Sequence, residues 1–191
     1  ITEVVAIRQK TRLADDVYRD LTEYAKNHGI AFAASVFDPE GLDLLASMNP
    51  PYIKIASTDL NNILFLRKVA EKGIKMIIST GMSPLSEVEH SVNELLKTGF
   101  DDIVLMHCVS AYPASLASMN LGFIDTLKTS FGFPVGLSDH TRGSIAACIS
   151  LTKGVSFIEK HFTLDRNQKG FDHKYAAEPD ELIQFIEDLH N

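Results

Sequence analysis

The amino-acid sequence predicts an α/β fold in which buried strands and helices alternate along the chain. Short runs rich in β-branched and apolar residues recur, and most are followed by a longer segment with the 3.6-residue periodicity of a helix. The runs are almost continuously hydrophobic, which is typical of parallel strands covered on both faces. Glycines lie where helices would end, just before the next run. Together these features predict a repeated βα unit of roughly 20 to 30 residues.

The expected elements are placed as follows. Six strands are expected, over residues 30–37, 52–57, 74–80, 102–108, 134–138 and 155–161. Helices are expected between them, over residues 60–70, 84–97, 121–130 and 141–151. Another helix, over about 13–28, precedes the first strand, and a last one begins at Pro179 and runs to about Leu189. The glycines that mark helix ends are Gly29, Gly73, Gly99, Gly132 and Gly154.

The distribution of polar residues favours one of two architectures that share this alternation. An open doubly wound sheet concentrates its chemistry at one switch point, whereas every strand of a (β/α)8 barrel can present side chains at its C-terminal end. Nearly every expected strand of this chain ends in polar residues. We therefore predict a TIM barrel, of which about six βα units are present. Six strands cannot close an eight-stranded barrel without open edges.

Composition bounds the class of protein and its partners. Of the 191 residues, 45% are hydrophobic and 23% are charged, which suits one globular domain. With 25 acidic against 18 basic residues, the net charge is -7, which argues against nucleic acid or an anionic membrane as a partner. No apolar run approaches the roughly 20 residues of a membrane span, and the chain does not open with a charged region followed by an apolar one, so we expect a protein that is not exported.

The cysteines and the first residue bear on the cellular compartment of the protein and on the extent of the polypeptide. Cys108 and Cys148 are far apart and lack metal-like spacing, so we expect reduced thiols and a cytoplasmic protein. The chain begins at Ile1 rather than at a methionine. We therefore expect it to be part of a longer polypeptide.

A lysine within an apolar strand is the first candidate for chemistry. Lys54 needs a partner, because an unpaired ammonium group is costly to bury. A bound anion and a neighbouring carboxylate satisfy this need equally well. Hydroxyl donors follow the strands around the same opening, and with Lys54 they would suit a small phosphorylated acid. These donors are Ser35, Ser57, Ser79 and Ser138.

Histidines at the ends of two adjacent strands suggest a metal site. His140 and His161 would lie within bridging reach in a barrel, and two imidazoles with open positions suit a catalytic divalent ion. The alternative is that one of them is a structural histidine. His107 also ends a strand, and we expect a structural or supporting role for it. The polar segment 165–174 is either a solvated loop or a substrate loop in which Asp172 holds sugar hydroxyls.

The strand ends resemble, in order, the motifs of the N-acetylneuraminate (sialic acid) synthase family, including its legionaminate, pseudaminate and spore-coat polysaccharide relatives. The similarity runs from about Ile30 to the C-terminus. The matching segments are KIAS at 54–57, STGM at 79–82, HCVSAYP at 107–113, GLSDHT at 136–141 and IEKHFTLDR at 158–166. The last three are highly specific as a set.

The resemblance implies an enzyme, a transferase that condenses phosphoenolpyruvate with an N-acetylated amino sugar such as N-acetylmannosamine. The products would be a nine-carbon 2-keto sugar acid and phosphate. By this likeness Glu159 and Asp172 contact the sugar, and His140 and His161 bind Mn2+ or Mg2+. Asp59 stands where the family commonly has glutamate as the proton acceptor. The residues implied for the phosphoenolpyruvate pocket are Ser35, Lys54, Ser57, Ser79, Ser110, Tyr112 and Ser138.

The resemblance also sets expectations about missing parts. It implies that strands 3 to 8 of the barrel are present, that two further strands would precede Ile1, and that a C-terminal antifreeze-like domain would follow Asn191. In the family that domain reaches across a homodimer. Two alternatives remain open: a non-catalytic binding or assembly module, and a related phosphoenolpyruvate-dependent synthase of eight- or seven-carbon keto sugar acids.

Overall fold

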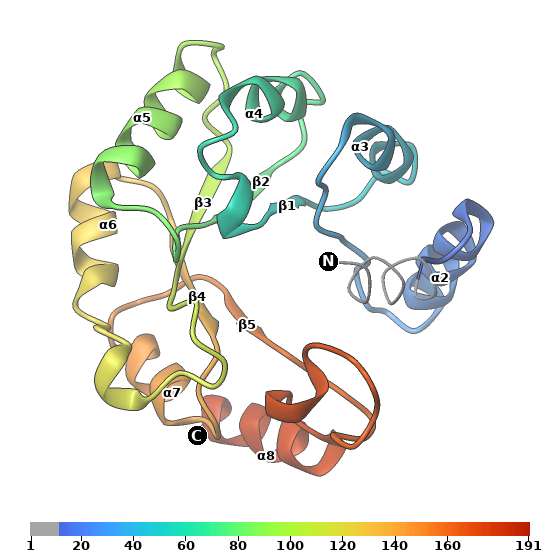
Figure 1. Cartoon of the computed structure of the whole chain (residues 1–191), viewed down its shortest axis with the longest axis vertical. Helices are drawn as coiled ribbons and strands as arrows, with labels where there is room; N and C mark the ends of the chain where they lie inside the picture. Colours follow the sequence, from blue (N-terminus) through green and yellow to red (C-terminus); the bar gives the residue numbers. More distant parts are fainter. Residues whose placement is uncertain (1–11) are drawn as a thin grey trace.

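Five parallel strands form a curled sheet with helices along its outer side (Figure 1). The computed structural model describes residues 12–191. The strands are β1 (Ile53–Ile55), β2 (Met76–Ser79), β3 (Ile103–Cys108), β4 (Val135–Asp139) and β5 (Ile158–Lys160), and each pairs with the next in sequence order. Because the strand order never reverses, the sheet has the topology of a half-barrel rather than of a doubly wound sheet.

Six of the helices in the described part of the chain occupy the positions that the periodicity predicts, with small shifts at their ends. Four helices connect successive strands: α4 (Ile63–Ala70), α5 (Leu85–Leu96), α6 (Phe123–Phe131) and α7 (Ile145–Thr152). Before β1 come α2 (Asp15–Asn27) and α3 (Pro39–Ala46), and α8 (Pro179–His190) is the last helix. The short 3-10 helices are η1 (Ser57–Asp59), η2 (Leu116–Ser118) and η3 (His173–Tyr175). No helix of the described part of the chain is both long and apolar enough to cross a membrane.

Two expectations about the N-terminal part need correction. Residues 30–37 do not form a regular strand: Ser35 makes one isolated parallel bridge to Lys54, supported by the hydrogen bonds Val36 N to Lys54 O and Lys54 N to Ala34 O. Among the described residues this segment pairs on one side only, which explains why the ladder is so short. Six complete βα units are therefore not confirmed.

Helix α3 was not anticipated, although a local signal for it exists. Asp38 accepts a hydrogen bond from Gly41 N at 2.7 Å, and Pro39 opens the helix. An N-cap aspartate followed by proline is a standard helix start. The eight-residue helix is short, and the sequence analysis did not single out this segment.

The strands separate two apolar regions. Alternate residues such as Ile53, Ile78 and Leu105 belong to the main core between the sheet and the helices. The intervening positions Ile77, Val104 and Met106 form a separate cluster on the concave side, with Tyr52 and Phe157 packed against it. The same alternation places Lys54, Ser79, Ser138 and Glu159 on the concave side.

Glycine is required at one point of the concave side. A Cβ atom at Gly136 would lie 2.3 Å from the Met106 sulfur and 2.7 Å from the Phe157 carbonyl oxygen. The space inside the curve of the sheet is therefore filled by side chains at this level, as in complete barrels.

Candidate active site

The centre of the site is a hydrogen-bonded group contributed by four strands. Lys54 of β1 is buried, and its ammonium group donates to Ser79 Oγ of β2 at 2.7 Å. The same nitrogen lies 3.5 Å from Glu159 Oε2 of β5. Ser138 of β4 donates to Glu159 Oε1 at 2.6 Å. We call these four residues the Lys54 cluster.

The Lys54 cluster bears on the question whether Lys54 pairs with a bound anion or with a neighbouring carboxylate. The ammonium group has a carboxylate neighbour, but the pair is loose, and the Glu159 side chain is 44% exposed. One carboxylate at 3.5 Å and one hydroxyl at 2.7 Å leave the cation able to take a further acceptor. The concave face thus has a buried positive charge that remains accessible to an anion.

His140 lies directly after β4 with a defined tautomer. Its Nδ1 is 2.7 Å from the Val109 carbonyl oxygen, and because that oxygen only accepts, Nδ1 carries the proton. Nε2 then keeps its lone pair and lies 3.4 Å from Ser138 Oγ. Burial lowers the pKa of His140, which favours the neutral ring. This is the form in which a histidine binds a metal ion.

The second imidazole stands beside the first. The ring centroids of His140 and His161 are 5.3 Å apart. Two imidazoles that share one ion at about 2.1 Å have centroids about 5 Å apart, so the spacing fits. Among the described residues no group of three or more histidine, cysteine, aspartate or glutamate side chains gathers around an ion-sized space. An ion held here would take its remaining ligands from water or substrate oxygens.

Tyr112 packs over the two histidines. Its ring centroid lies 4.2 Å from that of His140 and 5.8 Å from that of His161. Burial, followed by the charges of Cys108, Asp172 and Glu159, raises the pKa of Tyr112, so the phenol stays protonated. A neutral hydroxyl with an exposed edge is suited to contact a ligand above the histidines.

The remaining sequence-predicted residues are not joined to the Lys54 cluster by side-chain contacts in the described part of the chain. Ser57 accepts a hydrogen bond from Gly81 N at 3.2 Å and lies 3.3 Å from the Cys108 sulfur. Asp59 accepts from the Thr58 hydroxyl on η1. Ser35 and Ser110 are exposed. Ser57, Asp59 and Ser110 follow the C-terminal ends of β1 and β3, and Ser35 lies at the isolated bridge to Lys54 beside β1.

The structure adds a pair that the sequence analysis missed. Lys160 donates to Asp139 Oδ2 at 2.8 Å on the helix-facing side of β4 and β5. It also donates to the carbonyl oxygens of Thr141 and Gly143, and Phe185 of α8 lies under its ammonium group. These bonds fix the turn that carries His140. The signal was available, because Asp139 and Lys160 alternate with the concave-facing residues.

His107 lies outside the site. Its Nε2 is 2.6 Å from the Met119 carbonyl oxygen, and its ring contacts that of Phe123 at the start of α6. Burial lowers the pKa of His107. The structural role expected for this histidine agrees with these contacts.

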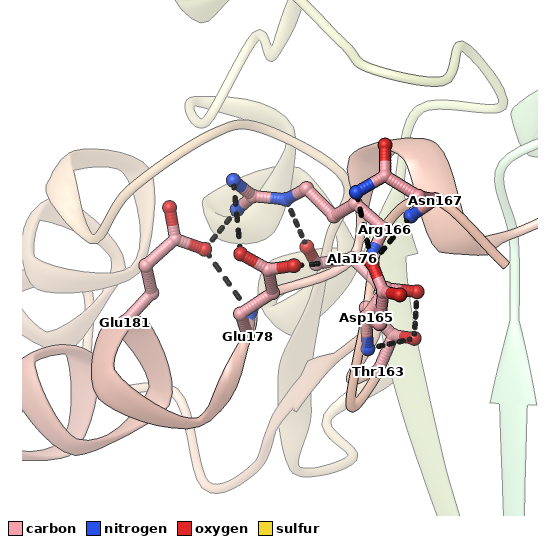
Figure 2. A network of polar contacts seen from close by, with 7 residues as sticks. All are labelled: Thr163, Asp165, Arg166, Asn167, Ala176, Glu178 and Glu181. Atoms are coloured by element: carbon pink, nitrogen blue, oxygen red, sulfur yellow. Dashed lines mark hydrogen bonds and ion pairs between the residues drawn. The ribbon is translucent and has the colours of Figure 1, made fainter.

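The loop after β5 is closed at its base and brings Asp172 to the site. The backbones of His161 and Thr163 pair with Ala177 at 2.8 and 2.9 Å. Figure 2 shows Arg166 binding the Ala176 carbonyl oxygen and the carboxylates of Glu178 and Glu181 at the start of α8. Asp172 Oδ2 lies 3.8 Å from His161 Nδ1. We call residues 163–178 the clasped loop.

Comparison with known proteins identifies relatives of the chain. The NeuB family matches residues 2–191. The chain is 42% identical over 176 residues to N,N'-diacetyllegionaminic acid synthase of Campylobacter jejuni, which covers 91% of this chain and 53% of that protein. An uncharacterized protein of Methanocaldococcus jannaschii is 41% identical over 188 residues, which is 98% of this chain and 56% of that protein.

A solved structure agrees with the fold as well. The crystal structure of N-acetylneuraminic acid synthetase from Leptospira borgpetersenii superposes with a TM-score of 0.93 and 34% identity, covering 99% of this chain and 66% of that one. The chain thus spans about half the length of the curated relatives it matches. Matches in sequence along nearly the whole chain and in structure show that it belongs to the NeuB family.

Proposed function

We propose that this chain carries the phosphoenolpyruvate and metal half of the active site of a nonulosonate synthase. The reaction is condensation of phosphoenolpyruvate with an N-acetylated amino sugar, such as N-acetylmannosamine, to give a nine-carbon 2-keto sugar acid and phosphate. The observation that carries the proposal is the Lys54 cluster beside His140 and His161. Relatives named as sialic and legionaminic acid synthases support the same class of reaction.

Phosphoenolpyruvate is the ligand that the Lys54 cluster suits best. The Lys54 ammonium group supplies a buried positive charge and donates to the Ser79 hydroxyl at 2.7 Å. The Ser138 hydroxyl belongs to the same cluster through its 2.6 Å hydrogen bond to Glu159. Charge-assisted hydrogen bonds of this kind are the strong ones for phosphate and carboxylate. Ser35, Ser57, Ser110 and Tyr112 on the rim are proposed to complete the pocket.

We propose that His140 and His161 hold a divalent ion, Mn2+ or Mg2+. The neutral ring of His140 and the spacing of the two rings fit, with open positions for oxygen ligands. When bound, such an ion acts as a Lewis acid on the sugar aldehyde oxygen, where negative charge develops. Asp172, beside His161, is proposed to accept hydrogen bonds from the sugar.

The reaction needs a proton acceptor as well as anion binding. Carbon 3 of phosphoenolpyruvate forms the new C–C bond to the aldehyde carbon, which leaves carbon 2 cationic. Water adds to carbon 2 and gives up a proton, and phosphate then leaves by C–O cleavage. Glu159 and Asp59 are the candidate proton acceptors in this chain. The contacts favour Glu159 over Asp59 as the proton acceptor, because Glu159 belongs to the Lys54 cluster.

Two other functions are compatible with parts of this geometry. A related synthase that makes an eight- or seven-carbon keto sugar acid would use the same anion and metal groups with a different aldehyde. A non-catalytic binding module would need neither the metal pair nor Glu159. The presence of the histidine pair next to the Lys54 cluster, which contains Glu159, favours an enzyme.

The test is phosphate release from phosphoenolpyruvate by the natural protein that carries this chain. The assay compares N-acetylmannosamine with a bacillosamine-derived sugar and with shorter aldehyde sugars, each with Mn2+ and after chelation. We expect release that needs both sugar and metal and that is lost in His140→Ala. A folded protein that releases no phosphate with any of these sugars contradicts the proposal. Release with only the shorter aldehyde sugars moves the assignment to the related synthase.

A further inference from the structure

A tyrosine on the clasped loop touches the site without having been predicted from the sequence. Tyr175 lies at the end of η3, and its hydroxyl donates a hydrogen bond to Asp172 Oδ1. Its ring centroid is 4.9 Å from that of Tyr112 and 5.3 Å from that of His161. Tyr175 thus contacts three residues of the site: Asp172, which is proposed to bind the sugar, His161, which is proposed to bind the metal ion, and the aromatic ring of Tyr112.

We propose that Tyr175 determines how the amino sugar is bound, by orienting the Asp172 carboxylate and by forming an aromatic wall beside it. The inference rests on the proposed function and assigns a substrate to one part of that site. It concerns the sugar because the hydrogen bond of Tyr175 is to Asp172, the proposed sugar contact. Its ring also lies beside Tyr112, which is proposed for the phosphoenolpyruvate pocket, but its hydroxyl does not bond to the Lys54 cluster.

The orientation of Asp172 follows from its two oxygens. Tyr175 engages Oδ1, and Oδ2 is directed toward His161 Nδ1 at 3.8 Å. A carboxylate oxygen has room for more than one donor, so each still accepts a sugar hydroxyl. Without Tyr175, the exposed Asp172 side chain would be free to rotate, and binding would have to order it.

The position of Tyr175 is fixed by the clasped loop. Arg166 ties the loop to the first turn of α8 through Glu178 and Glu181 (Figure 2). At the tip, a Cβ atom on Gly170 would lie 2.6 Å from the His173 ring, so only glycine allows this close approach. The His173 ring is held in turn by the Thr163 hydroxyl at 2.7 Å. The loop therefore presents Tyr175 and Asp172 in one arrangement.

The other side of Tyr175 faces a small cavity rather than packed core. Tyr175 helps to line a space of about 180 Å³ between the turn at Arg142 and Gly143 and the residues Gln184 and Asp188 of α8. Tyr175 lines this cavity and also contacts the ring of His161, which does not line it. Removing the ring would open the sugar side of the site into the cavity, and the wall for the apolar face of a sugar would be lost.

The experiment measures steady-state kinetics of the natural protein with each substrate varied in turn. Tyr175→Phe keeps the ring and removes the hydroxyl, and Tyr175→Ala removes both. We expect KM for the amino sugar to rise about tenfold in the first variant, as the loss of one hydrogen bond to a charged group implies, and further in the second. KM for phosphoenolpyruvate should stay within about twofold. Tyr24→Phe, on the exposed face of α2, is the matched control.

The outcomes separate this inference from the proposed function. A wild-type protein that condenses the sugar, with unchanged sugar KM in both Tyr175 variants, overturns the inference and leaves the proposed function in place. A parallel rise in both KM values together with a lower melting temperature also overturns it, since that is a structural role. A wild-type protein that uses no amino sugar removes both the proposed function and the inference.

Discussion

Two lysine–carboxylate pairs lie on opposite faces of the same sheet and are built differently. On the helix-facing side, Lys160 and Asp139 are 2.8 Å apart, with side chains that are 8% and 0% exposed. On the concave side, Lys54 and Glu159 are 3.5 Å apart, and Glu159 is 44% exposed. The first pair is enclosed, whereas the second is open to solvent.

The hydrogen bonds of the two lysines explain the difference. Lys160 donates to one carboxylate and two carbonyl oxygens, so all three of its donors are used. Within residues 12–191, Lys54 donates to the Ser79 hydroxyl and otherwise has only the Glu159 oxygen, at 3.5 Å. A saturated lysine stabilises the fold, while an unsaturated one retains the capacity to bind an anion. We therefore expect the helix-facing pair to stabilise the fold and the concave pair to take part in binding a ligand.

The largest expected effect on stability follows from Lys160→Met. The variant leaves the Asp139 carboxylate buried without its counterion, and we expect the free energy of unfolding to fall by about 3–5 kcal/mol. Urea denaturation of the natural protein measures this. Lys72→Met is the control, because Lys72 and Asp43 form a partly exposed surface pair whose loss should cost about 0–1 kcal/mol. Equal losses in the two variants would contradict the distinction between enclosed and open pairs.

Lys54→Met, unlike Lys160→Met, should lower activity strongly while changing stability little. We expect kcat/KM for phosphoenolpyruvate to fall by about 10²- to 10³-fold, because a preorganised cation is lost from a partly enclosed site. The free energy of unfolding should change by less than about 1 kcal/mol, since Glu159 remains accessible to water. A variant that unfolds easily but keeps its kinetic constants when folded would show that Lys54 is structural.

The smallest expected effect concerns His107 and pH. Burial lowers its folded-state pKa below the unfolded value of about 6.5. The unfolded state then binds more protons, so this contribution to stability is complete above about pH 6.5 and is lost as the pH falls through that value toward the folded pKa. His107→Gln, which can still donate to the Met119 carbonyl oxygen, should show a shallower loss of stability between pH 7.5 and 5.5 in urea denaturation. Identical pH slopes in the two proteins would rule out this role.

Much of the fold was readable from the sequence, because its signals are local. Hydrophobic runs and helix-ending glycines placed all five strands and their connecting helices, and the glycines at 29, 73, 99, 132 and 154 all have positive φ. Residues 30–37 looked like a strand for the same reason. Whether such a run forms a regular strand depends on neighbouring strands that pair with it on both sides. The hydrophobic pattern of the run does not predict those neighbours.

The site was readable where strand alternation decides it. Lys54, Ser79, Ser138 and Glu159 sit at concave-facing positions of regular strands and form one hydrogen-bonded group. The sequence led us to expect Lys54, Ser79 and Ser138 around one opening, whereas Glu159 was implied only by the resemblance, as a sugar contact. Asp59, Ser35 and Ser110 lie beyond regular strand, so no periodicity reports where their side chains point. Tyr175 was missed because its position depends on the clasped loop, whose Arg166 contacts join residues 10 to 15 positions apart.

The most direct test of the account is the binding of phosphoenolpyruvate to the natural protein, measured by calorimetry with Mn2+ present. Wild type, Lys54→Met and Lys160→Met are compared at a temperature where all three remain folded. We predict that Lys54→Met binds at least about tenfold more weakly than wild type, as the loss of a charge-assisted contact requires, and that Lys160→Met still binds. Binding of wild-type strength by Lys54→Met would contradict the claim that the open concave pair is the anion site.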